Sequence, residues 1–138
     1  MNAPFASTTN ERQSAGGGLL GRYATMLGAE MSGSGLTVHV DERYRLRLRS
    51  LPDGRIQVRA RLRALPEPGR ARDAALLHAG RLSCGRMNAS PAACVVDADE
   101  HALWLQQVAA SSSTQEIDEL VGEFCNELAF WTQAVPNE

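Results

Sequence analysis

The chain has 138 residues, of which 43% are apolar, so one globular domain can form a core without help from metals or disulfides. The net charge of −2 excludes the overall basic character of a typical nucleic-acid or anionic-membrane binder. Three well-separated cysteines, Cys84, Cys94 and Cys125, favour a reducing compartment over a disulfide framework. The sequence has no apolar run near the ~20 residues of a membrane span, and polar residues 1–13 lack a signal-peptide core.

The first 35 residues predict a lead and one helix. Residues 1–18 are rich in Ala, Ser, Thr, Asn and Gly, and we expect a disordered lead before a single domain over residues 19–135 and a tail over 136–138. Apolar residues after the lead recur at helical spacing, and Gly33 and Gly35 are expected to end the helix. These apolar residues are Leu19, Leu20, Tyr23, Met26, Leu27 and Met31.

From Leu36 the apolar residues recur at every second position, which is typical of strands with one buried face. Residues 36–40, 44–48 and 56–62 therefore predict an antiparallel meander, with a turn at Leu51-Pro52-Asp53-Gly54. The other face of the meander carries eight arginines between residues 43 and 63 against one aspartate, a local charge of +7.

The second half of the chain predicts two helices around a strand pair. Asp73 is expected to cap a short helix over residues 74–79 that stops near Gly80 and Gly85. Residues 93–97 and 102–109 predict strands joined by an acidic turn, and the second strand is apolar on both faces. Those two faces carry Leu103 and Leu105 on one side and Trp104 and Val108 on the other.

Ser113 and Glu116 form a capping-box pattern at the start of the last helix. Its expected buried face consists of Ile117, Leu120, Val121, Phe124, Leu128, Trp131 and Val135, whereas Asp118, Glu119, Glu123 and Glu127 are expected to be solvent-exposed. The element order is thus α-β-β-β-α-β-β-α. It predicts an α+β fold, a twisted antiparallel five-stranded sheet with three helices mainly on one face.

This order of elements resembles the class I type III secretion chaperones, the Tir-chaperone family, over roughly residues 19–135. The resemblance rests on the leading amphipathic helix, the hairpin with its Pro52-Asp53-Gly54 turn, the short helix containing Leu76 and Leu77, the strand pair around an acidic turn, and the last helix with Phe124 and Trp131. It implies a bacterial cytoplasmic homodimer that binds the N-terminal region of a secreted effector in extended form. It also implies that no cofactor is needed and that the effector is kept secretion-competent and directed to the export apparatus, whose ATPase is a further candidate partner.

Two apolar surfaces are expected to serve these contacts. The effector is expected to bind a groove between the first helix and the first strand, formed by Leu20, Tyr23, Met26, Leu27, Leu36, Val38 and Val40. Five strands with few helices leave one sheet face short of cover, and a twofold partner can supply that cover. The residues expected at this dimer interface are Leu76, Leu77, Trp104 and Val108.

The arginine-rich strand face leaves an alternative open, a nucleic-acid-binding or regulatory module. Nucleic-acid-binding faces usually interleave stacking aromatics, and only Tyr44 is available here, on the apolar side. His39, His78 and His101 lack metal-ligand spacing with the cysteines, and no nucleophile, phosphate-loop or metalloprotease motif is present. The sequence therefore predicts a binding protein without a catalytic or metal site, without nucleic-acid partners and without membrane insertion.

Overall fold

The computed structural model describes residues 18–136. Of the predicted lead, only Gly18 is described, and it is helical. Residues 137 and 138 of the predicted tail also lie outside the described residues. The described residues form two compact units. Unit 1 comprises residues 18–58 and 108–122, and unit 2 comprises residues 59–107 and 123–136. Strands β4 and β6 and helix α3, whose bounds follow, each contribute residues to both units.

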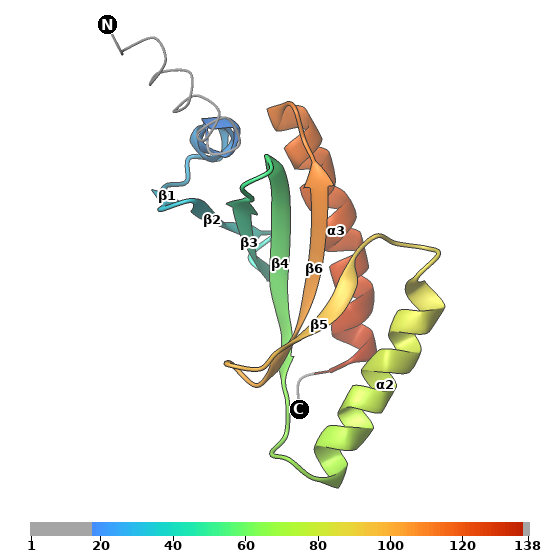
Figure 1. The fold of residues 1–138 in the computed structure, drawn as a ribbon. Helices are drawn as coiled ribbons and strands as arrows, with labels where there is room; N and C mark the ends of the chain where they lie inside the picture. Colours follow the sequence, from blue (N-terminus) through green and yellow to red (C-terminus); the bar gives the residue numbers. More distant parts are fainter. Residues whose placement is uncertain (1–17, 137–138) are drawn as a thin grey trace, which may run out of the picture. The chain divides into compact units, whose positions relative to one another are not determined.

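The sheet has six strands in the order β1-β2-β3-β4-β6-β5 (Figure 1). The strands are β1 (Met31–Ser32), β2 (Gly35–Val40), β3 (Tyr44–Ser50), β4 (Arg55–Ala64), β5 (Ala93–Asp97) and β6 (Ala102–Ala110). The predicted α+β fold with an antiparallel sheet is confirmed. The predicted strand number is one too low, because Met31 and Ser32 pair with β2 instead of extending the first helix.

The first helix covers residues 18–27 and ends earlier than predicted. Gly28 has a φ of +71°, a left-handed conformation that glycine adopts without steric cost. The backbone N–H of Ala29 donates to the carbonyl of Ala24 at 2.8 Å, and that of Gly28 donates to Thr25 at 3.1 Å. This is a Schellman motif, which satisfies the last carbonyls of the helix and turns the chain toward β1.

The β2–β3 hairpin has a three-residue loop without glycine, residues 41–43, because Val40 pairs with Tyr44. Asp41 and Glu42 have φ values of 53° and 57°, and the N–H of Arg43 donates to the carbonyl of Val40 at 3.0 Å. Two left-handed central residues define a type I′ turn, whose twist matches that of antiparallel strands. Arg43 follows this turn without a partner in the register, so Val40 pairs with Tyr44 and Val38 with Leu46, and the side chains of Val38 and Leu46 are buried.

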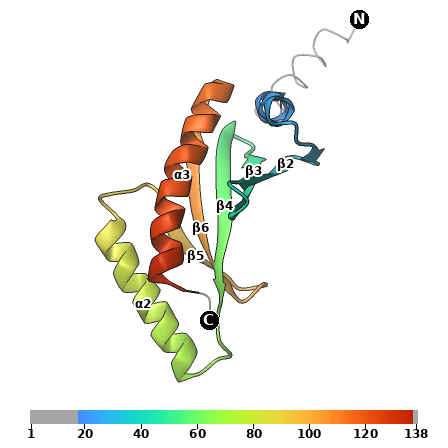
Figure 2. The ribbon, with the colours of Figure 1, turned by 180° about the vertical axis from the view of Figure 1, so that it is seen from behind.

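Helix α2 (Arg70–Arg86) has 17 residues and is much longer than predicted. It begins after Gly69 without a side-chain cap, so Asp73 is not the N-cap that was predicted. Asp73 lies in the first turn instead, where its negative charge interacts favourably with the positive end of the helix dipole. It also continues through Gly80 and Gly85, which cost a helix roughly 1 kcal/mol each but do not break it. In both views α2 lies beside the C-terminal half of α3 (Figure 1, Figure 2).

Helix α3 (Thr114–Ala134) is largely as predicted. The Oγ of Ser113 accepts a hydrogen bond from the N–H of Glu116 at 3.1 Å, whereas the Glu116 carboxylate accepts from the N–H of Ser112, one residue earlier than in a full capping box. The seven apolar residues predicted to be buried are all at most 6% exposed, which confirms the predicted face. Leu103, Trp104 and Leu105 are likewise buried, so both faces of β6 carry buried apolar side chains.

Candidate functional site

The seven residues predicted to bind the effector lie on the N-terminal helix and on β2, and they differ in their exposure to solvent. Tyr23 is 1% exposed, and its hydroxyl donates to the Asp118 carboxylate of unit 1 at 2.9 Å, which fixes the inner face of the helix. Leu20, Leu36 and Val38 are buried with it, and Val40 is half-buried. Met26 and Leu27 are 56% and 42% exposed. Of the seven residues, these two therefore offer most of the surface that a partner could cover.

A sheet edge lies close in sequence to these exposed side chains. Three residues separate the helix from β1, which is the first strand of the sheet and is only two residues long. β1 pairs with Gly35 and Leu36 alone, so the outer edge of residues 37–40 of β2 has no strand partner among the described residues. An edge of this kind presents backbone N–H and C=O groups to which an extended segment can add as a strand.

The predicted dimer residues also differ in exposure. Leu77 is 55% exposed and Leu76 is half-buried on α2, and Val108 is half-buried on β6. Trp104 is only 3% exposed, and the Arg59 guanidinium lies 4.7 Å from the centre of its ring. Trp104 therefore has little surface left to give to a partner.

Other side chains of unit 2 offer the apolar surface that Trp104 lacks. The exposed large apolar residues of this unit are Leu77, Met87 and Val96. Val96 lies on β5, the last strand of the sheet, which contacts α2.

The arginines of the meander are partly engaged within their own units. In unit 1, Arg55 donates to the Asp53 carboxylate at 2.7 Å, and Arg43 lies over the ring of Tyr44. In unit 2, Arg59 forms an ion pair with Asp97 at 3.6 Å in addition to its contact with Trp104. Arg45 and Arg49 are exposed on β3.

Glu127 corrects the prediction of a solvent-exposed acidic face on α3. It is 5% exposed, and its carboxylate accepts hydrogen bonds from the Nε and a terminal nitrogen of Arg86 and, at 3.0 Å, from the indole N–H of Trp131. Its pKa is held below the ordinary value, mainly by the hydrogen bonds from Arg86 and against the effect of burial. The guanidinium carbon of Arg86 also lies over the ring of Phe130, 4.4 Å from its centre. These contacts join the end of α2 to α3.

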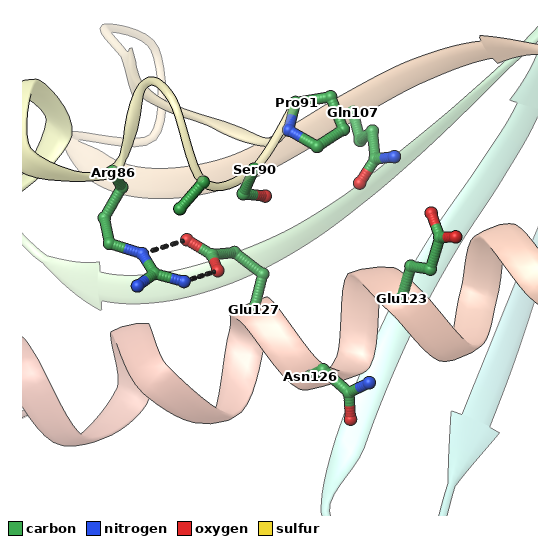
Figure 3. Close-up of a pocket in the computed structure, with 8 residues that line it drawn as sticks. Arg86, Ser90, Pro91, Gln107, Glu123, Asn126 and Glu127 are labelled. Atoms are coloured by element: carbon green, nitrogen blue, oxygen red, sulfur yellow. Dashed lines mark hydrogen bonds and ion pairs between the residues drawn. The ribbon is translucent and has the colours of Figure 1, made fainter.

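A pocket of about 440 Å³ opens beside this ion pair, wholly within unit 2 (Figure 3). Its polar side chains come from the end of α2, the following loop, β6 and α3, and they are Arg86, Ser90, Gln107, Glu123, Asn126 and Glu127. The prediction did not include this pocket. The only sequence signal was the spacing of Glu127 and Trp131, which are four residues apart on one helical face.

The histidines and cysteines do not gather into a site. Among residues 18–136, no group of three or more His, Cys, Asp or Glu side chains could hold a metal ion. A ring nitrogen of His78 lies 2.8 Å from the carbonyl of Ala134, which is a structural contact. Burial raises the pKa of the Cys94 thiol to about 11, so its reactive thiolate form is scarce at neutral pH. No helix among the described residues has the length and apolar character that crossing a bilayer requires.

No protein-family model matches this sequence, and no curated protein matches it either. Solved structures do match its fold. A chain of the HopA1–SchA chaperone–effector complex aligns with a TM-score of 0.61 and 10% identity over 91% of this chain and 97% of that one. A chain of the ExsC–ExsE complex aligns with a TM-score of 0.66 and 13% identity over 90% and 96%. The Yersinia pestis type III secretion chaperone SycH, in complex with a fragment of YscM2, aligns with a TM-score of 0.54 and 16% identity over 84% and 98%.

The chain has the fold of a type III secretion chaperone. The alignments cover nearly the whole of each matched chain and most of this one, so the likeness is not limited to one shared motif. At these identities the likeness concerns the fold, and the function has to be argued from the surfaces of this chain.

Proposed function

We propose that this protein is a bacterial cytoplasmic type III secretion chaperone, which binds the N-terminal region of an effector in extended form and keeps it competent for export. The observation that carries the proposal is the exposure of Met26 and Leu27 close in sequence to the open edge of β2. The likeness in fold to a chaperone–effector complex supports it. Binding alone achieves this function, and it needs neither a cofactor nor a catalytic residue.

The open edge of β2 and the apolar residues of the helix suit an unfolded client segment. A strand added to residues 37–40 would satisfy backbone groups of both chains, and its apolar side chains could cover Met26 and Leu27. Ordering such a segment costs about 2–5 kcal/mol, so the client must bury well over these two side chains. We therefore expect the client to extend beyond this first contact. Delivery of the client to the export apparatus, including its ATPase, is part of the proposal.

We further propose that the chaperone is a homodimer of the class I type whose interface includes α2. Only Ala79 is buried along the 17 residues of this helix, and Leu77 stands out from it. Helices in globular proteins gain most of their stability by burying an apolar face, and a second copy would supply the missing cover. Leu77→Asp should reduce the mass in light scattering from twice 14.9 kDa to 14.9 kDa, whereas Leu27→Asp should leave the dimer intact. A dimer that survives Leu77→Asp would contradict this interface.

The client contact can be tested with matched charge substitutions on one helix. The tagged chain is expressed in its native host, and the proteins that it retains are identified by mass spectrometry. Leu27→Asp and Met26→Asp should each lose the retained client, because a carboxylate cannot be buried under an apolar segment without a large desolvation cost. Thr25→Asp adds the same charge at an exposed polar position of the same helix, and it should retain the client. Equal retention by all three variants would contradict the proposed surface.

Salt dependence separates this function from nucleic-acid binding. Binding to phosphates weakens steeply as salt rises, because condensed counterions are released from the nucleic acid. A client held mainly by apolar and backbone contacts should be retained almost equally at low and high salt. Loss of the retained partner at high salt, together with recovery of RNA or DNA, would favour the arginine-rich face instead.

A further inference from the structure

The pocket of unit 2 has hydrogen-bonding groups that the protein itself leaves unused. Gln107 is 5% exposed, yet its side-chain amide has no hydrogen-bond partner among the described residues. Figure 3 shows this amide pointing from β6 toward α3, into the space between them. The amide opens into the pocket, so an occupant with a hydrogen-bond donor or acceptor can pair with it directly.

Three other side chains are available at the same opening. Glu123 and Asn126 project from α3 without a hydrogen-bond partner among residues 18–136. The Oγ of Ser90 accepts from the backbone N–H of Ala92 at 3.2 Å and remains able to donate. The available groups are therefore rich in acceptors, with one full negative charge on Glu123.

The Arg86–Glu127 pair sets the charge of the pocket. Arg86 is neutralised by Glu127 and lies on the ring of Phe130, so its charge is not available to an anion. With this pair counted as neutral, Glu123 leaves the pocket with a net charge of −1. An anionic occupant would be repelled, and an apolar occupant would leave Gln107, Asn126 and Glu123 without partners.

We propose that this pocket binds one guanidinium group carried on an aliphatic stem. A guanidinium is a planar cation with five N–H donors, which can pair with the Glu123 carboxylate and also donate to the amide oxygen of Gln107 or Asn126. An ammonium group is a more strongly hydrated point charge with three donors, so it loses more hydration and gains less here. The volume of about 440 Å³ is within the range of small-ligand pockets and accommodates the head group with part of its stem.

The guanidinium can come from an arginine side chain of a partner protein or from a free small molecule. The chemistry of the pocket is the same in both cases. The inference goes beyond the proposed client contact on the N-terminal helix, because none of the pocket residues belongs to that surface. The pocket can therefore bind a guanidinium even if the chaperone function is wrong.

The test uses NMR of the full chain and needs no client. The side-chain NH₂ signals of Gln107 and Asn126 are followed while one of three probes is added at millimolar concentrations. The probes are an acetylated Ala-Arg-Ala amide peptide, its citrulline counterpart and agmatine. Citrulline has nearly the shape of arginine but is neutral, so it separates recognition of the charged head from recognition of the stem. The arginine peptide should shift both signals to saturation, and the citrulline peptide should not.

A matched pair of variants tests the role of the charge. Glu123→Gln should weaken binding of the arginine peptide roughly tenfold, since a charge-assisted hydrogen bond becomes a neutral one. Glu119→Gln removes the same charge from an exposed position of α3 outside the pocket and should leave the affinity unchanged. Both variants are exposed and conservative, so both should fold. Asn126→Ala should weaken binding without changing the net charge.

The outcomes separate the two sources and can overturn the proposal. Saturation by the peptide alone indicates an arginine in a partner chain, because the flanking peptide groups are then needed. Saturation by agmatine as well indicates a site that also accepts free guanidinium compounds. The proposal is overturned if no probe saturates the signals, if the citrulline peptide binds as well as the arginine peptide, or if Glu119→Gln weakens binding as much as Glu123→Gln.

Discussion

Helices α2 and α3 are of similar length but use their surfaces in opposite ways. Helix α3 buries apolar side chains in every turn, among them Phe124 at 0% exposure and Trp131 at 1%. Helix α2 buries only Ala79, and its contacts with α3 include the Arg86–Glu127 pair, the cation–π contact of Arg86 with Phe130 and the approach of His78 to the carbonyl of Ala134. Burial of apolar area contributes most to stability, so α3 is part of the core and α2 is held at its margin. Helix α2 therefore has exposed apolar surface that a binding partner can bury, whereas α3 has little.

The sharpest test of this comparison exchanges one residue on each helix for alanine. Phe124→Ala should lower the free energy of unfolding by about 3–5 kcal/mol, because it leaves a cavity in a fully buried position. Leu77→Ala should cost a single chain about 0.5 kcal/mol or less, because its side chain is already exposed. Urea unfolding followed by circular dichroism measures both. Equal losses at a concentration where the protein is monomeric would refute the contrast between the helices.

The second test acts where the two helices are joined. Glu127→Gln should lower the free energy of unfolding by about 1–3 kcal/mol at neutral pH, because Arg86 loses its charged partner. The pKa of Glu127 is lowered in the folded protein, so its contribution is complete above the ordinary pKa of 4.5 and is lost as the pH falls through the lower folded value. The difference between the variant and the unchanged protein should therefore shrink on the acid side.

Urea unfolding at neutral pH and at a pH of about 3 checks this prediction. Glu119→Gln, on the same helix but exposed, should change the stability little at either pH. A difference for Glu127→Gln that stays constant across this range would show that the carboxylate charge does not stabilise the joint.

The sequence predicts α3 better than α2 for a physical reason. The seven buried residues of α3 recur at helical spacing, so the pattern and the structure report the same burial. Helix α2 has no such stripe, and its length was underestimated because Gly80 and Gly85 look like stop signals in a chain that happens to tolerate them. The first helix is likewise shorter than predicted. The Schellman turn at Gly28 ends it before Gly33 and Gly35, the two glycines expected to stop it.

The surfaces were harder to predict than the elements. Periodicity places Tyr23 and Met26 in one apolar stripe, but only the packed structure shows that Tyr23 is buried against Asp118 while Met26 is exposed. Trp104 is predicted at the dimer interface because both faces of β6 are apolar, and only the structure shows that Arg59, from a strand far away in sequence, lies over its ring. Glu127 is predicted to be solvent-exposed because its partner, Arg86, is 41 residues away in the sequence and the helical pattern does not show it. Contacts between distant segments are the part that pattern reading misses.

The smallest expected effect concerns the outer face of α2 and can be read from cysteine reactivity. Cys84 is exposed on α2, whereas the pKa of the Cys94 thiol on β5 is raised to about 11 by burial. A thiol reagent at neutral pH should therefore modify Cys84 first and Cys94 much more slowly, and Cys84→Ser should remove the fast phase.

Cys84 lies seven residues after Leu77, on the same face of the helix. If a second copy covers that face, modification of Cys84 should slow as the protein concentration rises, and Leu77→Asp should restore the fast rate. A rate that is fast at every concentration would mean that α2 stays uncovered and that its exposed face serves another contact.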